Sequence, residues 1–207
     1  MKLDDRFKNK TVVCLASGPS ITKCQVEIVR NSECPTIAVN NTFQLAPWCD
    51  ILFAADLRWW YRYFEEASQN KSELWTIKGV GEHFYKRTKS TPRINEVDFV
   101  RHPCLGKGNV VSHGGNSGYI AINLAYLFGA NKIVLVGYDH QHTNNKTHWH
   151  GDHDKKQFTQ NAGDTDRWLD NFDILAGELK EEGVDLVNCS ISTAITSCRR
   201  GNLEDEV

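Results

Sequence analysis

The sequence predicts an α/β fold in which one mostly parallel sheet is covered by helices on both faces. Short runs of continuous apolar residues, such as residues 11–16 and 132–136, alternate with segments of helical spacing. Continuous apolar runs are typical of strands buried on both faces, and their alternation with helices is typical of parallel sheets. A chain of 207 residues is long enough for one well-buried core, so we expect a single domain over residues 1–207.

The elements follow from the same two patterns, apolar runs and helical spacing. Apolar runs predict strands at residues 11–16, 36–39, 50–55, 73–77, 97–100, 132–136 and 184–188. Helical spacing predicts helices around residues 24–29, 58–67, 116–130 and 164–183. Polar and glycine-rich composition predicts loops at residues 79–95, 101–115 and 140–161, and a flexible acidic tail at residues 201–207.

Composition excludes several classes of protein. The formal net charge is -2, which gives no electrostatic footprint for nucleic acid. The first residues lack the apolar core of a signal peptide, and no run approaches the roughly 20 apolar residues that span a bilayer. The seven cysteines are scattered and form no C-x-x-C pair, which favours reduced thiols. We therefore expect a cytoplasmic protein without a membrane partner.

The first candidate motif is Gly18-Pro19-Ser20, directly after the first predicted strand. Glycine lets the backbone approach a phosphate, and Ser20 can cap the following helix, whose free N–H groups attract anions. The segment matches neither a Walker loop nor a G-x-G-x-x-G fingerprint. It is interpreted as a nucleotide-binding turn, with a plain strand-to-helix turn as the alternative.

Polar residues follow other predicted strands in the same way. Side chains able to hydrogen-bond a base, ribose or sugar lie at these ends: Asn40, Asn41 and Asp56. Asp139 follows a later predicted strand and is a candidate catalytic residue. A further set, Gly115, Asn116, Ser117 and Gly118, opens the most regular predicted helix and suits a phosphate. In open parallel sheets, ligands bind beyond the carboxyl ends of the strands where the strand order reverses. The coincidence of several polar strand ends predicts one binding site there.

A histidine-rich string, residues 148–153, matches the dizinc pattern H-x-H-x-D-H. It makes His148, His150, Asp152 and His153 candidate metal ligands. The dizinc hydrolases need a further histidine downstream, and no histidine follows His153. A histidine acting as general base in a loop over the site is the preferred interpretation.

The aromatic run at residues 59–64 has two interpretations. Its rings could stack on a base or sugar. Packing of an aromatic helix against the sheet is the commoner use of such a run, so we expect these rings to pack against the sheet.

Taken together, the motifs resemble a superfamily of Rossmann-like transferases. The resemblance rests on Gly18-Pro19-Ser20, Ala38-Val39-Asn40-Asn41, Gly115-Asn116-Ser117-Gly118 and Leu135-Val136-Gly137-Tyr138-Asp139, and covers roughly residues 11–200. The superfamily includes the bacterial family-42 sialyltransferases and the archaeal-type 6-hydroxymethyl-dihydropterin pyrophosphokinases. Small phage and prophage proteins of uncharacterised role look similar, including their His-Trp-His-Gly-Asp-His loop. The resemblance implies a single Rossmann-like domain.

The sialyltransferase likeness implies roles for individual residues. Gly18 and Ser20 would lie against the nucleotide, Asn40 would bind it, and Asn116 with Ser117 would lie beside the donor. A loop histidine would be the general base that deprotonates the acceptor hydroxyl, with His148, His150 and His153 all open. The tyrosines that hold the donor phosphate in that family have no match here, since Gln141, His142 and Thr147 occupy the stretch.

We therefore expect a glycosyltransferase-like, nucleotide-dependent transferase that takes a nucleotide or nucleotide-sugar donor. Lys or Arg side chains from residues 86–107 could stabilise the leaving phosphate. The pyrophosphokinase likeness implies an alternative, an ATP-dependent enzyme with Mg²⁺ or Mn²⁺ on Asp56 and Asp139. A non-catalytic nucleotide-binding phage module and a metal-dependent hydrolase stay open. The acceptor, the oligomeric state (including a homo-oligomer) and a host cytoplasm for a phage-encoded chain also stay open.

Overall fold

The computed structural model describes residues 3–142, 146–151 and 162–207, with the side chains of 162–165 left out. The strands are β1 (Thr11–Leu15), β2 (Thr36–Val39), β3 (Ile51–Phe53), β4 (Glu73–Ile77), β5 (Asn95–Val100), β6 (Val110–Ser112), β7 (Lys132–Val136), β8 (Asp185–Asn188) and β9 (Arg199–Arg200). The helices are α1 (Lys23–Asn31), the 3₁₀ helix η1 (Asn40–Gln44), α2 (Leu57–Ala67), α3 (Val80–Thr88), α4 (Ser117–Leu127), α5 (Ala162–Glu181) and α6 (Leu203–Glu206).

The nine strands form one sheet in the order β6-β5-β4-β3-β2-β1-β7-β8-β9. Every pairing between these strands is parallel. The predicted α/β fold with a mostly parallel sheet is therefore confirmed. The chain builds outward from β1 to β6, then returns to pair β7 with the other side of β1. The strand order reverses between β1 and β7, and this reversal fixes the place where a ligand is expected.

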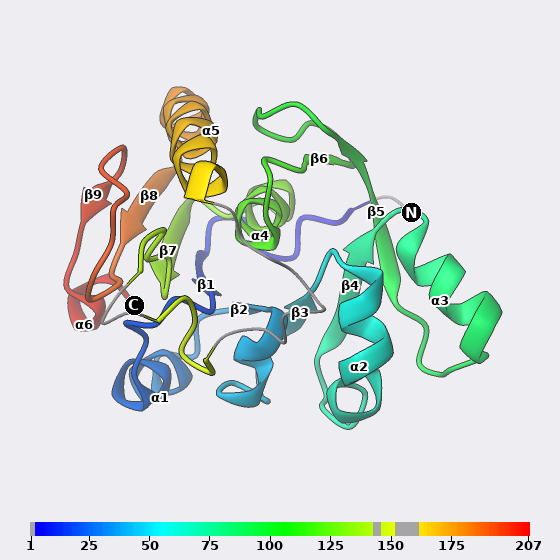
Figure 1. Cartoon of the computed structure of the whole chain (residues 1–207). Coiled ribbons are helices and arrows are strands. Elements are labelled where there is room, and N and C mark those ends of the chain that lie inside the picture. Colours follow the sequence, from blue (N-terminus) through cyan, green and yellow to red (C-terminus); the bar gives the residue numbers. More distant parts are fainter. Residues whose placement is uncertain (1–2, 143–145, 152–161) are drawn as a thin grey trace.

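Helices cover both faces of the sheet, as Figure 1 shows. One face packs its apolar side chains, such as Val12, Cys14 and Ile133, with α4 and α5. The other face packs Val13, Leu15 and its neighbours against α1, η1, α2 and α3. Alternate residues of β1 thus enter opposite cores, which explains why buried parallel strands are apolar at every position.

Two predicted loops contain regular structure. Residues 79–95 include α3, and residues 101–115 include β6. Basic and polar side chains hide the pattern of α3, because only Gly81 and Phe84 of that helix are buried. The two-residue edge strand β9 was also missed, since two arginines carry no strand signal.

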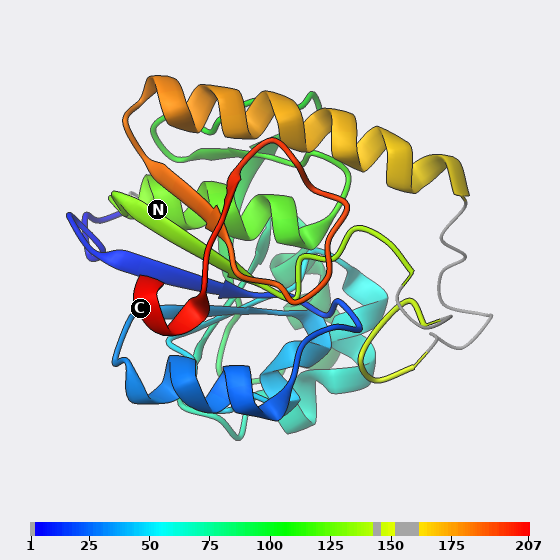
Figure 2. The same ribbon diagram turned by 90° about the vertical axis from the view of Figure 1, so that its left-hand side faces the viewer.

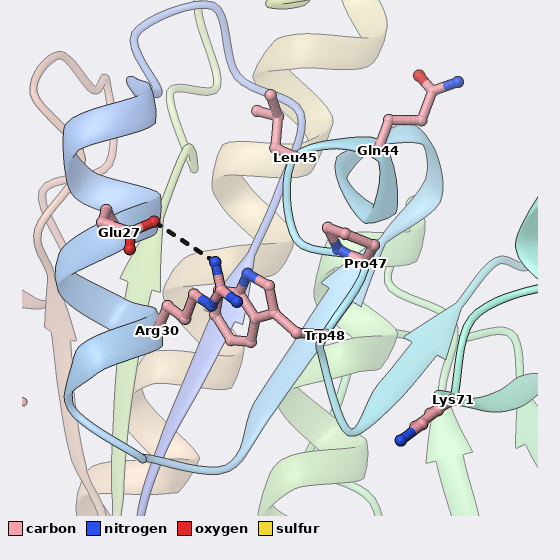
Figure 3. Close-up of a pocket in the computed structure, with 7 residues that line it drawn as sticks. All are labelled: Glu27, Arg30, Gln44, Leu45, Pro47, Trp48 and Lys71. Atoms are coloured by element: carbon pink, nitrogen blue, oxygen red, sulfur yellow. Dashed lines mark ion pairs between the residues drawn. The ribbon is translucent and has the colours of Figure 1, made fainter.

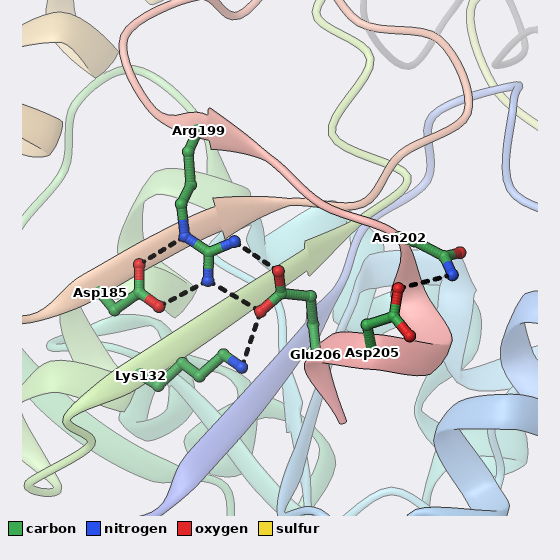
Figure 4. Close-up of polar contacts among 6 residues, drawn as sticks. All are labelled: Lys132, Asp185, Arg199, Asn202, Asp205 and Glu206. Atoms are coloured by element: carbon green, nitrogen blue, oxygen red, sulfur yellow. Dashed lines mark hydrogen bonds and ion pairs between the residues drawn. The ribbon is translucent and has the colours of Figure 1, made fainter.

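The C-terminal residues 201–207, predicted to be a flexible acidic tail, are instead a docked segment containing α6. Leu203 packs into the core beneath α1. Glu206 accepts hydrogen bonds from Arg199, and Lys132 Nζ lies 2.7 Å from Oε2, an oxygen that Arg199 also contacts (Figure 4). Arg199 also binds Asp185 at 2.6 and 2.9 Å. Acidic composition alone did not show that Leu203 packs into the core or that Glu206 pairs with Arg199 and Lys132.

No helix in the described part of the chain combines the length and apolar character needed to cross a membrane.

All seven cysteines lie in the described part of the chain, and all seven carry free thiols. Burial raises the pKa of the Cys14 thiol to about 12 and that of Cys49 to about 11, so both are inert packing residues.

Candidate functional site

The loops after β1 and β7 meet at the reversal point of the sheet. The N–H of Gly18 donates to the carbonyl oxygen of Gly137 at 2.8 Å. Ser20 donates to the carboxylate of Asp139 twice, through its N–H at 2.8 Å and its hydroxyl at 2.7 Å. A side chain on Gly18 would place its Cβ 2.3 Å from an Asp139 oxygen. We call this contact set the β1–β7 clamp.

The clamp changes the interpretation of two predicted residues. Ser20 was expected to cap α1, but Thr22 is the N-cap and forms a reciprocal capping box with Gln25. Ser20 is bound to Asp139 instead. Asp139 was a predicted catalytic residue, and its side chain is 1% exposed with both oxygens accepting from Ser20. Its described contacts make it a positioning residue that holds the two loops in register. Pro19, which lies between Gly18 and Ser20 in the loop after β1, is half-buried.

The loop after β1 also contacts the end of β2 and the histidine segment. The Ser17 hydroxyl lies 2.9 Å from the Thr42 hydroxyl and 3.4 Å from the Val39 carbonyl oxygen. The backbone N–H of Trp149 donates to the carbonyl oxygen of Ser17 at 3.1 Å. Figure 2 shows the yellow-green segment that follows β7 lying beyond the arrowheads of the strands. The described histidines of this segment therefore lie at the carboxyl edge of the sheet.

The predicted polar residues after β2 and β3 have different roles. Asn40 has a left-handed backbone with φ of 50° and is half-buried, so its amide stands at the strand end. Asn41 is buried, and its oxygen accepts from the Trp59 indole at 2.8 Å. Asp56 caps α2 by accepting from the N–H groups of Arg58 and Trp59. Asn40 is thus the best placed of the three to meet a ligand.

The aromatic run of α2 packs against the sheet, as predicted. Trp59, Trp60 and Phe64 are buried, and the Trp60 indole donates to the Ala54 carbonyl oxygen at 3.0 Å. These rings fix the position of the β2 and β3 strand ends. They do not line an open surface for a base.

The N-terminus of α4 is the second predicted anchor. Asn116 is the N-cap, and its side-chain oxygen accepts from the Tyr119 N–H at 2.9 Å. The Ser117 hydroxyl accepts from the Ala55 N–H at 3.3 Å, which connects α4 to the end of β3. Gly115 has φ of 101°, a conformation that glycine adopts without strain. Gly118 packs against Tyr138, and the Tyr138 hydroxyl donates to the carbonyl oxygen of Gly118 at 3.1 Å.

The histidine string is described only in part. The rings of His148 and His150 stack with centroids 5.2 Å apart and planes 6° apart. Asp152 and His153 lie outside the described residues, so their part in a metal or catalytic site is untested. Among the residues that are described, no group of three His, Cys, Asp or Glu side chains could hold a metal ion.

Four further residues lie at this edge and were not among the predicted site residues: His113, His140, Trp168 and Phe172. His140 has φ of 49°, and its ring packs edge-on to Phe172 of α5, with centroids 5.6 Å apart. Burial lowers the pKa of His140 to about 4, so its ring is neutral at pH 7. Trp168 of α5 lies against the backbone of Gly115. Burial and the nearby charge of Arg101 lower the pKa of His113, which accepts from the Gly115 N–H.

The cations expected to stabilise a leaving phosphate divide between the two edges of the sheet. Lys86, Arg87, Lys89 and Arg93 lie at the end of α3 or in the connection to β5, and therefore at the amino edge. Arg101 follows the carboxyl end of β5 and lies near His113. Lys107 lies in the turn that precedes β6, where its backbone pairs with Val110. Of the six cations of residues 86–107, Arg101 is the one that directly follows the carboxyl end of a strand.

A separate hollow of about 550 Å³ lies between α1 and the segment after η1 (Figure 3). It is lined by Glu27, Arg30, Gln44, Leu45, Pro47, Trp48 and Lys71. None of the predicted site residues lines it. It is a second location, apart from the carboxyl edge, at which a ligand could bind.

Comparison of the chain with protein-family models, with curated proteins and with solved structures found no match in any of the three. The resemblance to Rossmann-like transferases therefore still rests on the sequence motifs alone. The geometry of the carboxyl edge is the remaining evidence on function.

Proposed function

We propose that this chain is a nucleotide-dependent, glycosyltransferase-like enzyme whose donor binds at the carboxyl edge around the β1–β7 reversal. The observation that supports it is the convergence of six segments there. Described hydrogen bonds connect the loop after β1 with those after β2 and β7 and with the histidine segment, and the β3 end with the α4 N-terminus. Open parallel sheets bind ligands at this location.

The proposed donor site uses groups with different chemistry. Asn40 offers an amide to the base or ribose. The first turn of α4 offers backbone N–H groups and the positive end of its dipole to a phosphate. The backbone around Gly18 follows β1, which lies between β2, the strand before Asn40, and β7 in the sheet order.

The proposed reaction is transfer of a glycosyl group to an acceptor hydroxyl. A histidine of the segment, His148 or His150, takes the hydroxyl proton as the acceptor oxygen bonds to the anomeric carbon. The bond from that carbon to the phosphate oxygen breaks, and its electron pair leaves with the nucleotide. The α4 N-terminus stabilises the charge that develops on this oxygen.

No described contact favours the alternative with a divalent ion on Asp56 and Asp139. Both oxygens of Asp139 accept from Ser20, and an Asp56 oxygen caps α2. A metal ion on these carboxylates would compete with those hydrogen bonds. The described contacts therefore favour a transferase that requires no divalent ion on these two carboxylates.

Thermal unfolding with CMP, UDP, GDP and ATP, each with and without Mg²⁺ or Mn²⁺, tests the proposal. A nucleotide at about 100 times its Kd should stabilise the fold by about 2.7 kcal/mol, which raises Tm by roughly 5–10 °C. Asn40→Gly should abolish this shift. Asn9→Gly is the matched control, because Asn9 is also left-handed, with φ of 59°, but precedes β1 at the other edge. No shift with any nucleotide would refute the proposal.

A further inference from the structure

Three buried side-chain nitrogens without a hydrogen-bond partner lie around the N-terminus of α4. They are Asn116 Nδ2, Trp168 Nε1 and His140 Nδ1, and none has a partner among the described residues. Buried polar groups nearly always find a partner, so an unpaired one calls for a bound molecule to complete it. Three in one region point to a single ligand.

The contacts of these residues place them together. The Trp168 indole lies so close to Gly115 that a Cβ there would be 2.7 Å from Nε1. Asn171, one turn along α5, donates to the Gly114 carbonyl oxygen at 2.9 Å and fixes α5 against this loop. The His140 ring lies 6.4 Å from the Trp168 ring, edge to face.

The orientation of Asn116 is fixed by its capping role. Its oxygen accepts from the Tyr119 N–H, so the other end of the amide must be the Nδ2 donor. The indole nitrogen of Trp168 is also a donor only. The first turn of α4 adds N–H groups that have no partner within the helix. The neutral His140 ring adds a third donor in the tautomer that carries its proton on Nδ1. Such a set of donors attracts an acceptor-rich, negatively charged group.

We propose that Asn116, Trp168 and His140 form an oxyanion subsite at the N-terminus of α4 that binds a phosphate group. This inference rests on the proposed function, because the phosphate would belong to the nucleotide donor. It adds the side of the site contributed by α5 and by the loop after β7. Trp168 and His140 become binding residues, and the indole N–H becomes a direct reporter of phosphate binding.

The test is NMR of the indole N–H groups in ¹⁵N-labelled protein, titrated with inorganic pyrophosphate. Trp168→Phe assigns the Trp168 signal, and it keeps an aromatic ring in place while removing the donor. The expected result is a saturable shift of the Trp168 signal with no shift of the Trp48 signal, which reports on the separate hollow. Asn116→Asp should weaken pyrophosphate binding at least about tenfold, because a negatively charged carboxylate replaces the amide N–H group that donates to the anion.

Asn116→Asp separates binding from folding. Asp caps a helix as well as Asn does, so a purely structural role predicts unchanged stability and unchanged pyrophosphate binding. Trp48→Phe, remote from α4, is the control and should bind pyrophosphate as the wild type does.

The outcomes separate the two proposals. A Trp168 signal that ignores pyrophosphate, in a protein whose Tm rises with a nucleotide, overturns the subsite and leaves the proposed function. A Trp168 shift without any nucleotide effect supports the subsite and counts against the proposed function. Pyrophosphate binding that is equal in wild type and Asn116→Asp overturns the subsite, and a buried water is then the partner of these nitrogens.

Discussion

The β1–β7 clamp makes Gly18→Ala the most informative single substitution. An alanine Cβ would lie 2.3 Å from Asp139 Oδ1 and 2.4 Å from the Gly137 carbonyl oxygen. Neither atom can move freely, because the carbonyl accepts from the Gly18 N–H and the carboxylate from Ser20. Overpacking costs about 1–3 kcal/mol, and loss of a clamp hydrogen bond adds about 1 kcal/mol or more. We expect a loss of about 3 kcal/mol.

Urea unfolding without ligand measures this effect. With a slope near 2 kcal/mol per molar urea, the midpoint should fall by about 1.5 M. Gly177→Ala is the matched control, since nothing lies within 4 Å of its Cβ position on the exposed face of α5. It should stabilise the protein by about 0.5–1 kcal/mol. If Gly18→Ala unfolds within about 0.5 kcal/mol of the wild type, the clamp does not constrain the fold.

Three further substitutions or conditions test other parts of the structure by the same unfolding assay. Asp139→Ala should cost about 1–3 kcal/mol because it leaves the Ser20 N–H unpaired. Asp139→Asn should cost less, since the Ser20 hydroxyl can turn to accept; equal losses would contradict this. Arg199 and Lys132 lower the pKa of Glu206 to about 2, so the stability that Glu206 contributes is present above pH 4.5 and is lost as pH falls toward 2. Glu206→Gln should therefore lower the free energy of unfolding by about 1 kcal/mol at pH 7, a modest value because Arg199 is exposed. A stability difference between this variant and the wild type that persists at pH 2 would contradict the ion pairing of Glu206. Burial lowers the pKa of His140 in the folded protein to about 4, so as the pH falls the unfolded chain takes up this proton before the folded protein does. The free energy of unfolding should therefore fall between pH 6.5 and 4, by at most about 3 kcal/mol. His140→Gln should show a smaller fall over this pH range, and an equal fall would argue against burial of the ring.

The fold was largely predictable because strands buried on both faces leave a strong pattern. The apolar run at residues 132–136 coincides with β7. The amphipathic pattern at 164–183 lies within two residues of α5 at both ends. Polar residues directly after such strands must reach the carboxyl edge, so Asn40 and Asp139 could be placed there before any geometry was known.

The contacts between loops were not predictable, because they join residues far apart in the chain. Ser20 is a plausible helix cap in sequence, and only the packing of the β7 loop reveals its partner Asp139, 119 residues away. Trp168 and Phe172 follow an amphipathic helical pattern that indicates core packing. Nothing in that pattern shows that the Trp168 indole meets Gly115.

A structure of the protein with a bound nucleotide tests the central claim most directly. The transferase proposal predicts the nucleotide at the carboxyl edge, with its phosphate at the first turn of α4 beside Asn116 and its base or ribose near Asn40. A nucleotide bound instead in the hollow beside Trp48 and Arg30 would contradict the proposed site.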